Sequence, residues 1–224
     1  MCGDCTIYNP IIRYGGWYTD TDTVTVDRTD HLENVVASSG AFVANGNLVF
    51  SPGNGFLEQM MIRAEQKFTG KGWNSLGSLT FLFLRITHLI AGPVLLTETI
   101  MSECHAGRGT NQTIIGDHPD CWGLSVLNHT IFYPLKSPER RTLFQQHGDN
   151  FWKQIFFGAV SVHFFGSNTS GRGWVTGNHT AYDYLGRLFC PSVYSVQNNM
   201  NLWYASPACC LAKAKAKGYS CVCV

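Results

Sequence analysis

The stretch Arg13-Tyr14-Gly15-Gly16-Trp17-Tyr18-Thr19-Asp20-Thr21-Asp22 organises the first part of this chain. Its two adjacent glycines can adopt positive φ, so they predict the end of a helix and a sharp turn. The residues that follow predict a strand, a turn and a second strand over 17–26. Residues i and i+2 of an extended chain project to the same side, so Asp20 and Asp22 can converge on one cation. Hard oxygen ligands suit Mg²⁺ or Mn²⁺ carrying a diphosphate.

An Asp-x-Asp pair is weak evidence by itself, because about one such pair arises by chance in a chain of this size. A solvated turn is the simplest alternative interpretation. A calcium-binding EF-hand loop requires an acidic or amide side chain at its fifth position, where this chain has Val24. An EF-hand is therefore excluded, and the surrounding sequence has to decide between a turn and a metal site.

Composition indicates a globular protein and gives no reason to expect nucleic acid as a partner. Hydrophobic residues make up 45% of the 224 residues and charged residues 14%, which excludes a disordered acidic or basic tail. The formal net charge of +1 provides no electrostatic attraction for a phosphate backbone. The length suits one sizeable domain with its own core.

Strands alternate with helices along the chain, which is typical of a mixed α/β domain. Two short buried strands, 41–44 and 48–50, are expected around a turn at Asn45-Gly46. A buried strand is expected over the apolar run 155–165. Helices are expected over 56–68, 93–104 and 180–188.

The cysteines and glycosylation sequons favour an oxidising, secretory compartment. The chain has nine cysteines, and Asn-x-Ser/Thr sequons occur at Asn111, Asn128, Asn168 and Asn178. No signal peptide opens the chain, so a lumenal location requires a targeting segment further upstream. The apolar stretch 79–96 contains Arg85 and His88, and this argues against a membrane span.

A series of motifs in a fixed order resembles one family of transferases. Residues 14–22 read Tyr-Gly-Gly-x-Tyr-x-Asp-x-Asp, which is similar to the sugar-binding region of the α1,4-galactosyl- and α1,4-N-acetylglucosaminyltransferases. Further similar segments are 42–50, 92–97, Phe132-Tyr133-Pro134, Val162-His163 and Phe189-Cys190-Pro191. The chain therefore resembles the α1,4-glycosyltransferase (globotriaosylceramide synthase-like) family over residues 13–195.

The resemblance implies an α/β, GT-A-like glycosyltransferase fold. Residues 1–200 are expected to form the transferase domain, with an apolar insertion at 75–91, and residues 201–224 an unmatched Cys- and Lys-containing tail. Because Asp20 stands so near the first residue, most of the N-terminal nucleotide-binding half of a GT-A fold is expected to be missing. The membrane anchor of the family's type II topology is expected in that missing part, with the domain in the Golgi lumen.

The resemblance also assigns site residues. Asp20 and Asp22 are expected to hold Mn²⁺ (or Mg²⁺), with Asp22 favoured as the direct ligand. His163 is a third metal ligand or a diphosphate contact, and the simpler alternative is a satisfied histidine at a strand end. A disulfide between Cys104 and Cys121 is expected.

Donor or acceptor contacts are expected at Tyr14, Gly15, Gly16, Asn45 and Trp73. Two of these assignments have equally simple structural alternatives. Asn45 either hydrogen-bonds a sugar hydroxyl or serves as a turn residue in Asn-Gly. Trp73 either stacks on the acceptor sugar or packs in the core.

The implied activity is transfer of a hexose or N-acetylhexosamine from a UDP-sugar, with galactose favoured. The acceptor is a galactose-terminated glycolipid or glycan, and the product is an α1,4 linkage formed with retention. The sequence shows no nucleophile, so a covalent intermediate and a same-face substitution both remain open. An alternative function is a catalytically inactive lumenal homologue that binds or scaffolds, and a cysteine-rich secreted module without transferase chemistry is the third possibility.

Overall fold

The chain folds into two compact units. The computed structural model describes residues 3–40, 42–69, 92–104, 114–165, 177–189 and 191. One unit comprises Met1–Tyr18 and Asp30–Asn128, and the other Thr19–Thr29 and His129–Val224. The segment that carries Asp20 and Asp22 therefore belongs to the second unit, although it lies near the beginning of the sequence.

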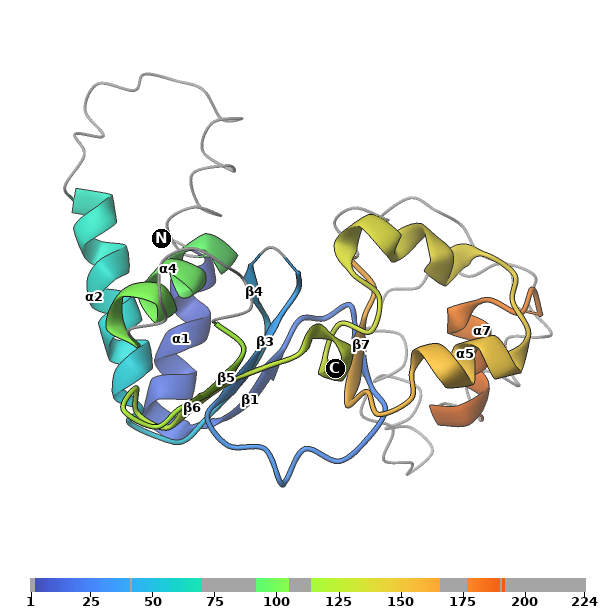
Figure 1. Ribbon diagram of the computed structural model, residues 1–224, viewed down its shortest axis with the longest axis horizontal. Helices are drawn as coiled ribbons and strands as arrows, with labels where there is room; N and C mark the ends of the chain where they lie inside the picture. The colour runs from blue at the N-terminus through green and yellow to red at the C-terminus, as the bar shows by residue number, and fades with distance from the viewer. Residues whose placement is uncertain are drawn as a thin grey trace, which may run out of the picture. The chain divides into compact units, whose positions relative to one another are not determined.

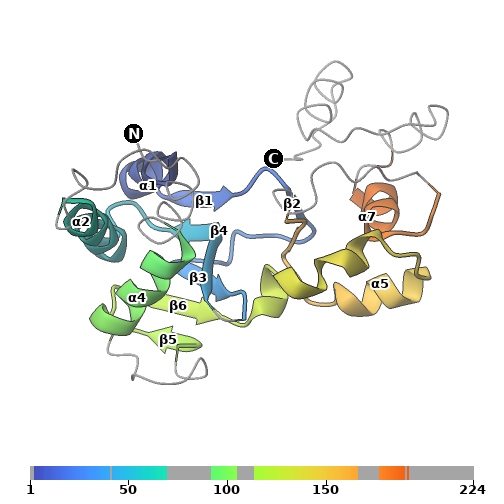
Figure 2. The same cartoon turned by 90° about the horizontal axis from the view of Figure 1, so that it is seen from above.

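The first unit is a five-stranded mixed sheet with helices packed against it (Figure 1). Its strand order is β1-β4-β3-β6-β5; β3 pairs antiparallel with β4 and parallel with β6, and β5 pairs antiparallel with β6. Helices α2 and α4 lie side by side (Figure 2). In chain order the elements are α1 (Gly3–Tyr14), β1 (Gly16–Thr19), β3 (Val35–Ser38), β4 (Val43–Phe50), α2 (Gly55–Thr69), α4 (Pro93–Glu103), β5 (Gly116–His118) and β6 (Leu124–Leu127).

One apolar core holds these elements together. It joins buried side chains of α1, β3, β4, α2, α4 and β6, among them Tyr8, Val36, Leu48, Met60 and Leu95. The predicted helices 56–68 and 93–104 are confirmed as α2 and α4. The predicted disulfide is also confirmed: Cys104 at the C-terminus of α4 is bonded to Cys121, which lies before β6 and is buried in this core.

The helix stop predicted at the glycine pair is confirmed. Helix α1 ends at Tyr14, and Gly15 and Gly16 adopt φ of 65° and 104°. The Gly15 backbone N–H donates to the Ile11 carbonyl at 2.8 Å and closes the helix. A Cβ on Gly15 would lie 2.6 Å from Cδ of Pro52, so the chain passes this point only because the residue has no side chain.

The prediction of two strands around an Asn45-Gly46 turn is wrong. Residues 43–50 form the single strand β4. A two-residue hairpin turn at Asn-Gly needs positive φ at both residues, and neither has it. The pairing with β3 instead shifts between the partners Ala37↔Ala44 and Val35↔Val49, so the extra residues of β4 form an irregularity inside the strand.

The second unit is built on a two-stranded antiparallel ribbon of β2 (Thr23–Thr25) and β7 (Ser161–His163). Trp152, Leu143, Val162, Phe164 and Leu185 form its buried core. Around the ribbon lie η3 (His129–Ile131), η4 (Ser137–Phe144), α5 (Asp149–Ile155) and α7 (Ala181–Phe189). The predicted helix 180–188 is confirmed as α7, whose first turn is closed by reciprocal hydrogen bonds between Thr180 and Asp183.

The prediction of a buried strand over 155–165 is wrong for its first half. Ile155 is the last residue of α5, and only Ser161–His163 is strand. Gly158 has φ of 73° and turns the chain between these elements, which leaves the Phe157 side chain 85% exposed. The apolar run 155–165 therefore contains the end of a helix, a turn and a strand, and its hydrophobic pattern alone does not distinguish these from one continuous strand.

Several sequence predictions lie outside the described residues: Trp73, the insertion 75–91, the tail 201–224, and the sequons at Asn111 and Asn168. Among the described residues, no helix combines the length and apolar character needed to cross a lipid bilayer.

The two glycines after α1 offer a matched test of this turn. Gly16→Ala is expected to lower the free energy of unfolding by about 1–2 kcal/mol, because an L-residue is strained at positive φ. Gly15→Ala is expected to cost about 1–3 kcal/mol more, since its methyl group also meets Pro52. Urea unfolding of both variants measures the difference, and equal losses would contradict the close approach of Gly15 to Pro52.

Candidate metal centre

A cluster of two carboxylates and one imidazole lies at one end of the β2–β7 ribbon. Asp20 and Asp22 occupy the turn that leads into β2, and His163 is the last residue of β7. The antiparallel register pairs Thr23 with His163, and the Phe164 N–H donates to the Asp22 carbonyl at 2.8 Å. The ladder thus brings His163 beside Asp20, which lies 143 residues earlier in the chain, and beside Asp22.

The donor atoms are arranged closely enough to share one cation. Nε2 of His163 is 3.2 Å from Oδ2 of Asp20 and 3.3 Å from Oδ1 of Asp22. One oxygen from each aspartate and one imidazole nitrogen lie within 4.8 Å of one another. An octahedral Mg²⁺ with ligands at about 2.1 Å places them roughly 3–4 Å apart, so the set fits a cation with small side-chain adjustments. The aspartate side chains are 39% and 27% exposed, which leaves them accessible to a ligand.

The hydrogen bonds of His163 fix its tautomer. The Phe165 backbone N–H donates to Nδ1 of His163 at 3.2 Å, so Nδ1 carries no proton. The proton of the neutral ring is then on Nε2, where it donates toward the two aspartates. Coordination of a cation through Nε2 would require this proton to move to Nδ1, and the Phe165 N–H would lose its acceptor.

Aromatic side chains hold the imidazole in place. The Tyr133 ring is 5.7 Å from the His163 ring and the Phe165 ring 4.6 Å, both edge-on. Tyr133 is buried, and Phe165 has a positive φ of 55°, a strained conformation for an aromatic residue. This packing restricts rotation of the ring and keeps Nε2 directed at the aspartates.

Tyr182 of α7 is a further neighbour of the cluster. Its ring packs at 4.0 Å on Phe164. Burial, and secondly the negative charge of Asp22, raise the pKa of the Tyr182 hydroxyl well above its usual range. The phenol therefore stays protonated and neutral beside the carboxylates.

Sequence reasoning missed Tyr133, Phe165 and Tyr182 as neighbours of the site. Tyr133 stood within the Phe-Tyr-Pro motif, which was a usable signal, although the motif alone assigned it no role. The proximity of Tyr182 depends on how α7 packs on the ribbon, and no local pattern encodes that packing.

Comparison with known proteins finds sequence relatives of this chain. Residues 87–197 match the profile of the alpha 1,4-glycosyltransferase conserved region. The chain is 21% identical over 183 residues to the lactosylceramide 4-alpha-galactosyltransferase of Gorilla gorilla gorilla, which covers 81% of this chain and 50% of the relative. It is 23% identical over 185 residues to the human alpha-1,4-N-acetylglucosaminyltransferase, covering 82% of this chain and 48% of the relative.

Residues 87–197 carry the conserved region of the α1,4-glycosyltransferases. The resemblance inferred from the ordered motifs is thereby confirmed, and the mixed α/β architecture is compatible with a GT-A-like fold. The chain spans about half the length of the curated relatives it matches. No solved structure matches it.

The α1,4-glycosyltransferase profile covers one of the three cluster residues directly. His163 lies within 87–197, whereas Asp20 and Asp22 precede the matched region. The β2–β7 pairing therefore joins a residue of the conserved region to an acidic pair outside it.

The predicted sugar contacts that fall on described residues lie in the first unit. Tyr14 is exposed and lies under the Arg13 guanidinium at 5.1 Å. Gly15 and Gly16 form the turn after α1. Nδ2 of Asn45 donates to the Tyr8 hydroxyl at 3.5 Å. Asn45 lies inside strand β4, so it is not the turn residue that one of the two interpretations expected. Roles for these residues in sugar binding remain predictions.

Two of the predicted sequons lie among the described residues. Asn128 and the Thr130 of its sequon are exposed. Asn178 is half-buried, and the Thr180 of its sequon is buried with its hydroxyl bonded to Asp183. Modification of either asparagine remains a prediction.

The tautomer of His163 can be measured directly. We expect the neutral, metal-free ring to carry its proton on Nε2, because Nδ1 accepts from Phe165. Long-range ¹H–¹⁵N correlation spectra distinguish the two tautomers. His129 is the internal control, since its Nδ1 faces the Tyr133 carbonyl at 3.1 Å and must carry the proton. An Nδ1-protonated His163 in the metal-free chain would contradict this assignment.

Proposed function

We propose that this chain transfers a hexose or N-acetylhexosamine, with galactose favoured, from a UDP-sugar to a galactose-terminated glycolipid or glycan. The product is an α1,4 linkage formed with retention of the anomeric configuration. The observation that carries the proposal is the Asp20–Asp22–His163 cluster in a chain that carries the conserved region of the α1,4-glycosyltransferases. The names of the relatives, a galactosyltransferase that acts on lactosylceramide and an N-acetylglucosaminyltransferase, support the donor and acceptor classes.

Asp20 and Asp22 hold a divalent cation, Mn²⁺ or Mg²⁺, in this proposal. Asp22 is the favoured direct ligand, because its backbone carbonyl is fixed to the Phe164 N–H and its side chain is the less exposed of the two. Once bound, the cation neutralises negative charge that develops on the diphosphate leaving group.

His163 serves as the diphosphate contact rather than a third ligand in this proposal. Its Nε2–H points at the aspartates and can donate to a carboxylate oxygen or to a diphosphate oxygen beside them. This role preserves the hydrogen bond from Phe165 to Nδ1, which coordination would break. The neutral Tyr182 hydroxyl limits the negative charge around Asp22, so the carboxylates remain the main anionic groups for the cation.

The Golgi lumen is the proposed location, with membrane association through an N-terminal anchor. The Cys104–Cys121 disulfide and the exposed sequon at Asn128 support an oxidising, secretory compartment. A non-catalytic scaffolding role is less well supported, because the relatives are named as transferases and the acidic cluster retains a metal-compatible geometry.

Calorimetric titration with UDP in the presence and absence of Mn²⁺ tests the proposal. We expect UDP to bind the full chain only with Mn²⁺, because the diphosphate needs the cation held by the aspartates. Asp22→Asn removes one anionic ligand and is expected to weaken Mn²⁺-dependent binding by about 100-fold or more. Asp120→Asn changes an exposed carboxylate of the first unit and should leave binding unchanged.

Metal-independent UDP binding, or Mn²⁺-dependent binding that survives in Asp22→Asn, would contradict the metal centre. Circular dichroism of each variant confirms that it is folded before the comparison is made. The same titration with Mg²⁺, followed by the ¹H–¹⁵N spectra, separates the two roles of His163: coordination moves its proton to Nδ1, and donation to an oxygen leaves it on Nε2.

A further inference from the structure

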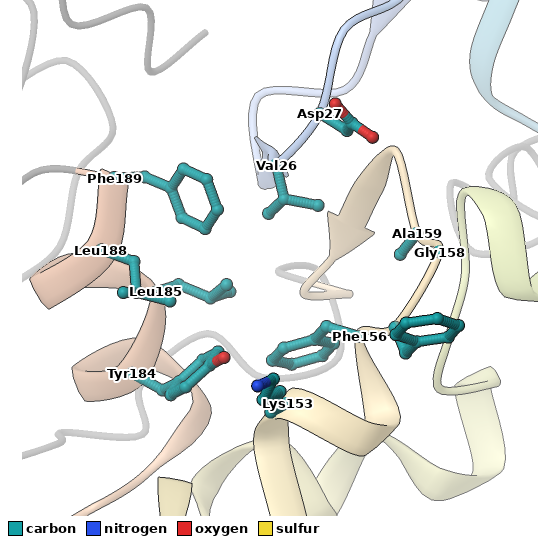
Figure 3. A pocket seen from close by; sticks show the side chains of 11 residues that line it. Val26, Asp27, Lys153, Phe156, Gly158, Ala159, Tyr184, Leu185, Leu188 and Phe189 are labelled. Atoms are coloured by element: carbon teal, nitrogen blue, oxygen red, sulfur yellow. The ribbon is translucent and has the colours of Figure 1, made fainter. Parts of the chain in front are cut away.

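The β2–β7 ribbon has one apolar face and one polar face. Val24 packs against the core of the second unit, and Val26 lines an open pocket between the end of β2 and helix α7 (Figure 3). Side chains alternate between the two faces of a strand, so Thr23 and Thr25 project from the side opposite to these valines. The register places His163 on the threonine side, because residues paired across two strands share a face.

Thr23 stands directly opposite His163 in the ladder. The Phe164 N–H donates to the Asp22 carbonyl at 2.8 Å, so the hydrogen bond of the ladder flanks the Thr23↔His163 pair instead of joining it. Side chains of such a pair approach closely, with Cβ atoms about 4.5–5.5 Å apart. The Thr23 N–H donates to the Asp20 carbonyl at 3.1 Å and closes the turn that carries both aspartates. The Thr23 side chain therefore leaves the ribbon beside the imidazole, at the base of the acidic turn.

The hydroxyl group of Thr23 is buried without a hydrogen-bond partner. Thr23 is 4% exposed, and its Oγ1 has no partner among the residues that the structure describes. An unpaired buried hydroxyl costs free energy that a valine of the same shape would not. The other buried threonines of the described chain all have partners: the Pro93 carbonyl for Thr97, the Leu95 carbonyl for Thr99 and the Asp183 carboxylate for Thr180.

We propose that Thr23 positions the cation of the metal centre through a water molecule. Its hydroxyl oxygen accepts a hydrogen bond from a water that binds the cation held by Asp20 and Asp22. This inference rests on the proposed function and adds a residue to the same site. Because Oγ1 makes no hydrogen bond to either carboxylate, Thr23 acts through the water and is a positioning residue, not a metal ligand.

The coordination chemistry of the cation supplies such a water. Mg²⁺ and Mn²⁺ prefer octahedral oxygen coordination, and Mg²⁺ keeps several waters because it dehydrates reluctantly. Two carboxylates and a diphosphate leave positions in that shell for water. A cation polarises the protons of a bound water, which makes the water a strong hydrogen-bond donor. The Thr23 hydroxyl oxygen is an acceptor on the face of the ribbon where this donor requires one.

A neutral hydroxyl group fits this role better than a charged side chain. A third carboxylate beside Asp20 and Asp22 would add repulsion in the metal-free chain, and a lysine would compete with the cation for the two that are present. A hydroxyl orients a water without changing the charge of the site. A threonine at the start of β2 also retains the β-branched shape that favours a strand.

Binding of Mn²⁺ alone tests the inference. The full chain is titrated with Mn²⁺ in the absence of UDP, and free Mn²⁺ is measured by electron paramagnetic resonance. Thr23→Val removes the hydroxyl and keeps the shape, and we expect it to weaken Mn²⁺ binding about 10- to 100-fold, as the loss of an outer-shell partner does. Thr23→Ser keeps the hydroxyl and is expected to bind Mn²⁺ as tightly as the unaltered chain.

Unfolding of the metal-free chain provides a second measurement. Thr23→Val is expected to raise the urea midpoint, because it removes an unpaired buried hydroxyl. A threonine with a purely structural role would give the opposite result, a lower midpoint and unchanged Mn²⁺ binding. Thr25→Val is the matched control on the same face of β2. Thr25 lies two residues, about 7 Å, further along the strand, so this variant should leave Mn²⁺ affinity unchanged.

Mn²⁺ affinity that survives in Thr23→Val, or a lower urea midpoint for that variant, would overturn the inference. Titration with UDP separates this result from the proposed function. If Mn²⁺ binding depends on the Thr23 hydroxyl and no UDP binds, the positioning role stands and the transferase proposal fails. If UDP binds with Mn²⁺ as proposed and Thr23→Val binds both equally well, the inference about Thr23 alone fails. An unaltered chain that binds no Mn²⁺ would overturn both.

Discussion

The antiparallel pairing of β2 with β7 is the constraint on which the second unit depends. Three residue pairs, from Thr23↔His163 to Thr25↔Ser161, join the segment after the motif aspartates to a strand from the last third of the described chain. Without this ladder, Asp20 and Asp22 would sit on an isolated turn, because nothing else in their local sequence holds them beside an imidazole. The pairing closes a long loop, and that entropic cost is offset by burial of Val162, Phe164 and Trp152 beneath the ribbon.

The electrostatics of the cluster follow from the same ladder. Two carboxylates one residue apart repel each other, and the repulsion is relieved by a proton donor or by a cation between them. His163 supplies the donor in the metal-free chain, and its tautomer is set by the Phe165 N–H behind the ring. In the proposed function a divalent cation takes the place of this hydrogen-bond donor between the carboxylates, whose oxygens are already close together and partly exposed.

The sequence predicted the parts of the structure that local chemistry determines. The glycine turn at Gly15, the helices α2, α4 and α7 and the convergence of Asp20 with Asp22 follow from backbone freedom, periodicity and spacing. Elsewhere tertiary contacts override local preference. Asn45-Gly46 has the composition of a hairpin turn, and pairing with β3 keeps it inside a strand. The run 155–165 is apolar throughout, although Phe157 faces solvent at a pocket that only the folded chain assembles.

The motif over residues 14–22 divides into two parts with different physical roles. Gly15 lacks room for a side chain because Pro52 approaches it within the first unit, so backbone packing alone requires a glycine there. Asp20 and Asp22 lie in the second unit, where two partly exposed carboxylates stand beside one imidazole. A residue type that the fold does not need, placed where like charges repel, is better explained by a ligand than by stability. Within one short motif, therefore, packing explains the glycine, and the proposed metal site explains the aspartates.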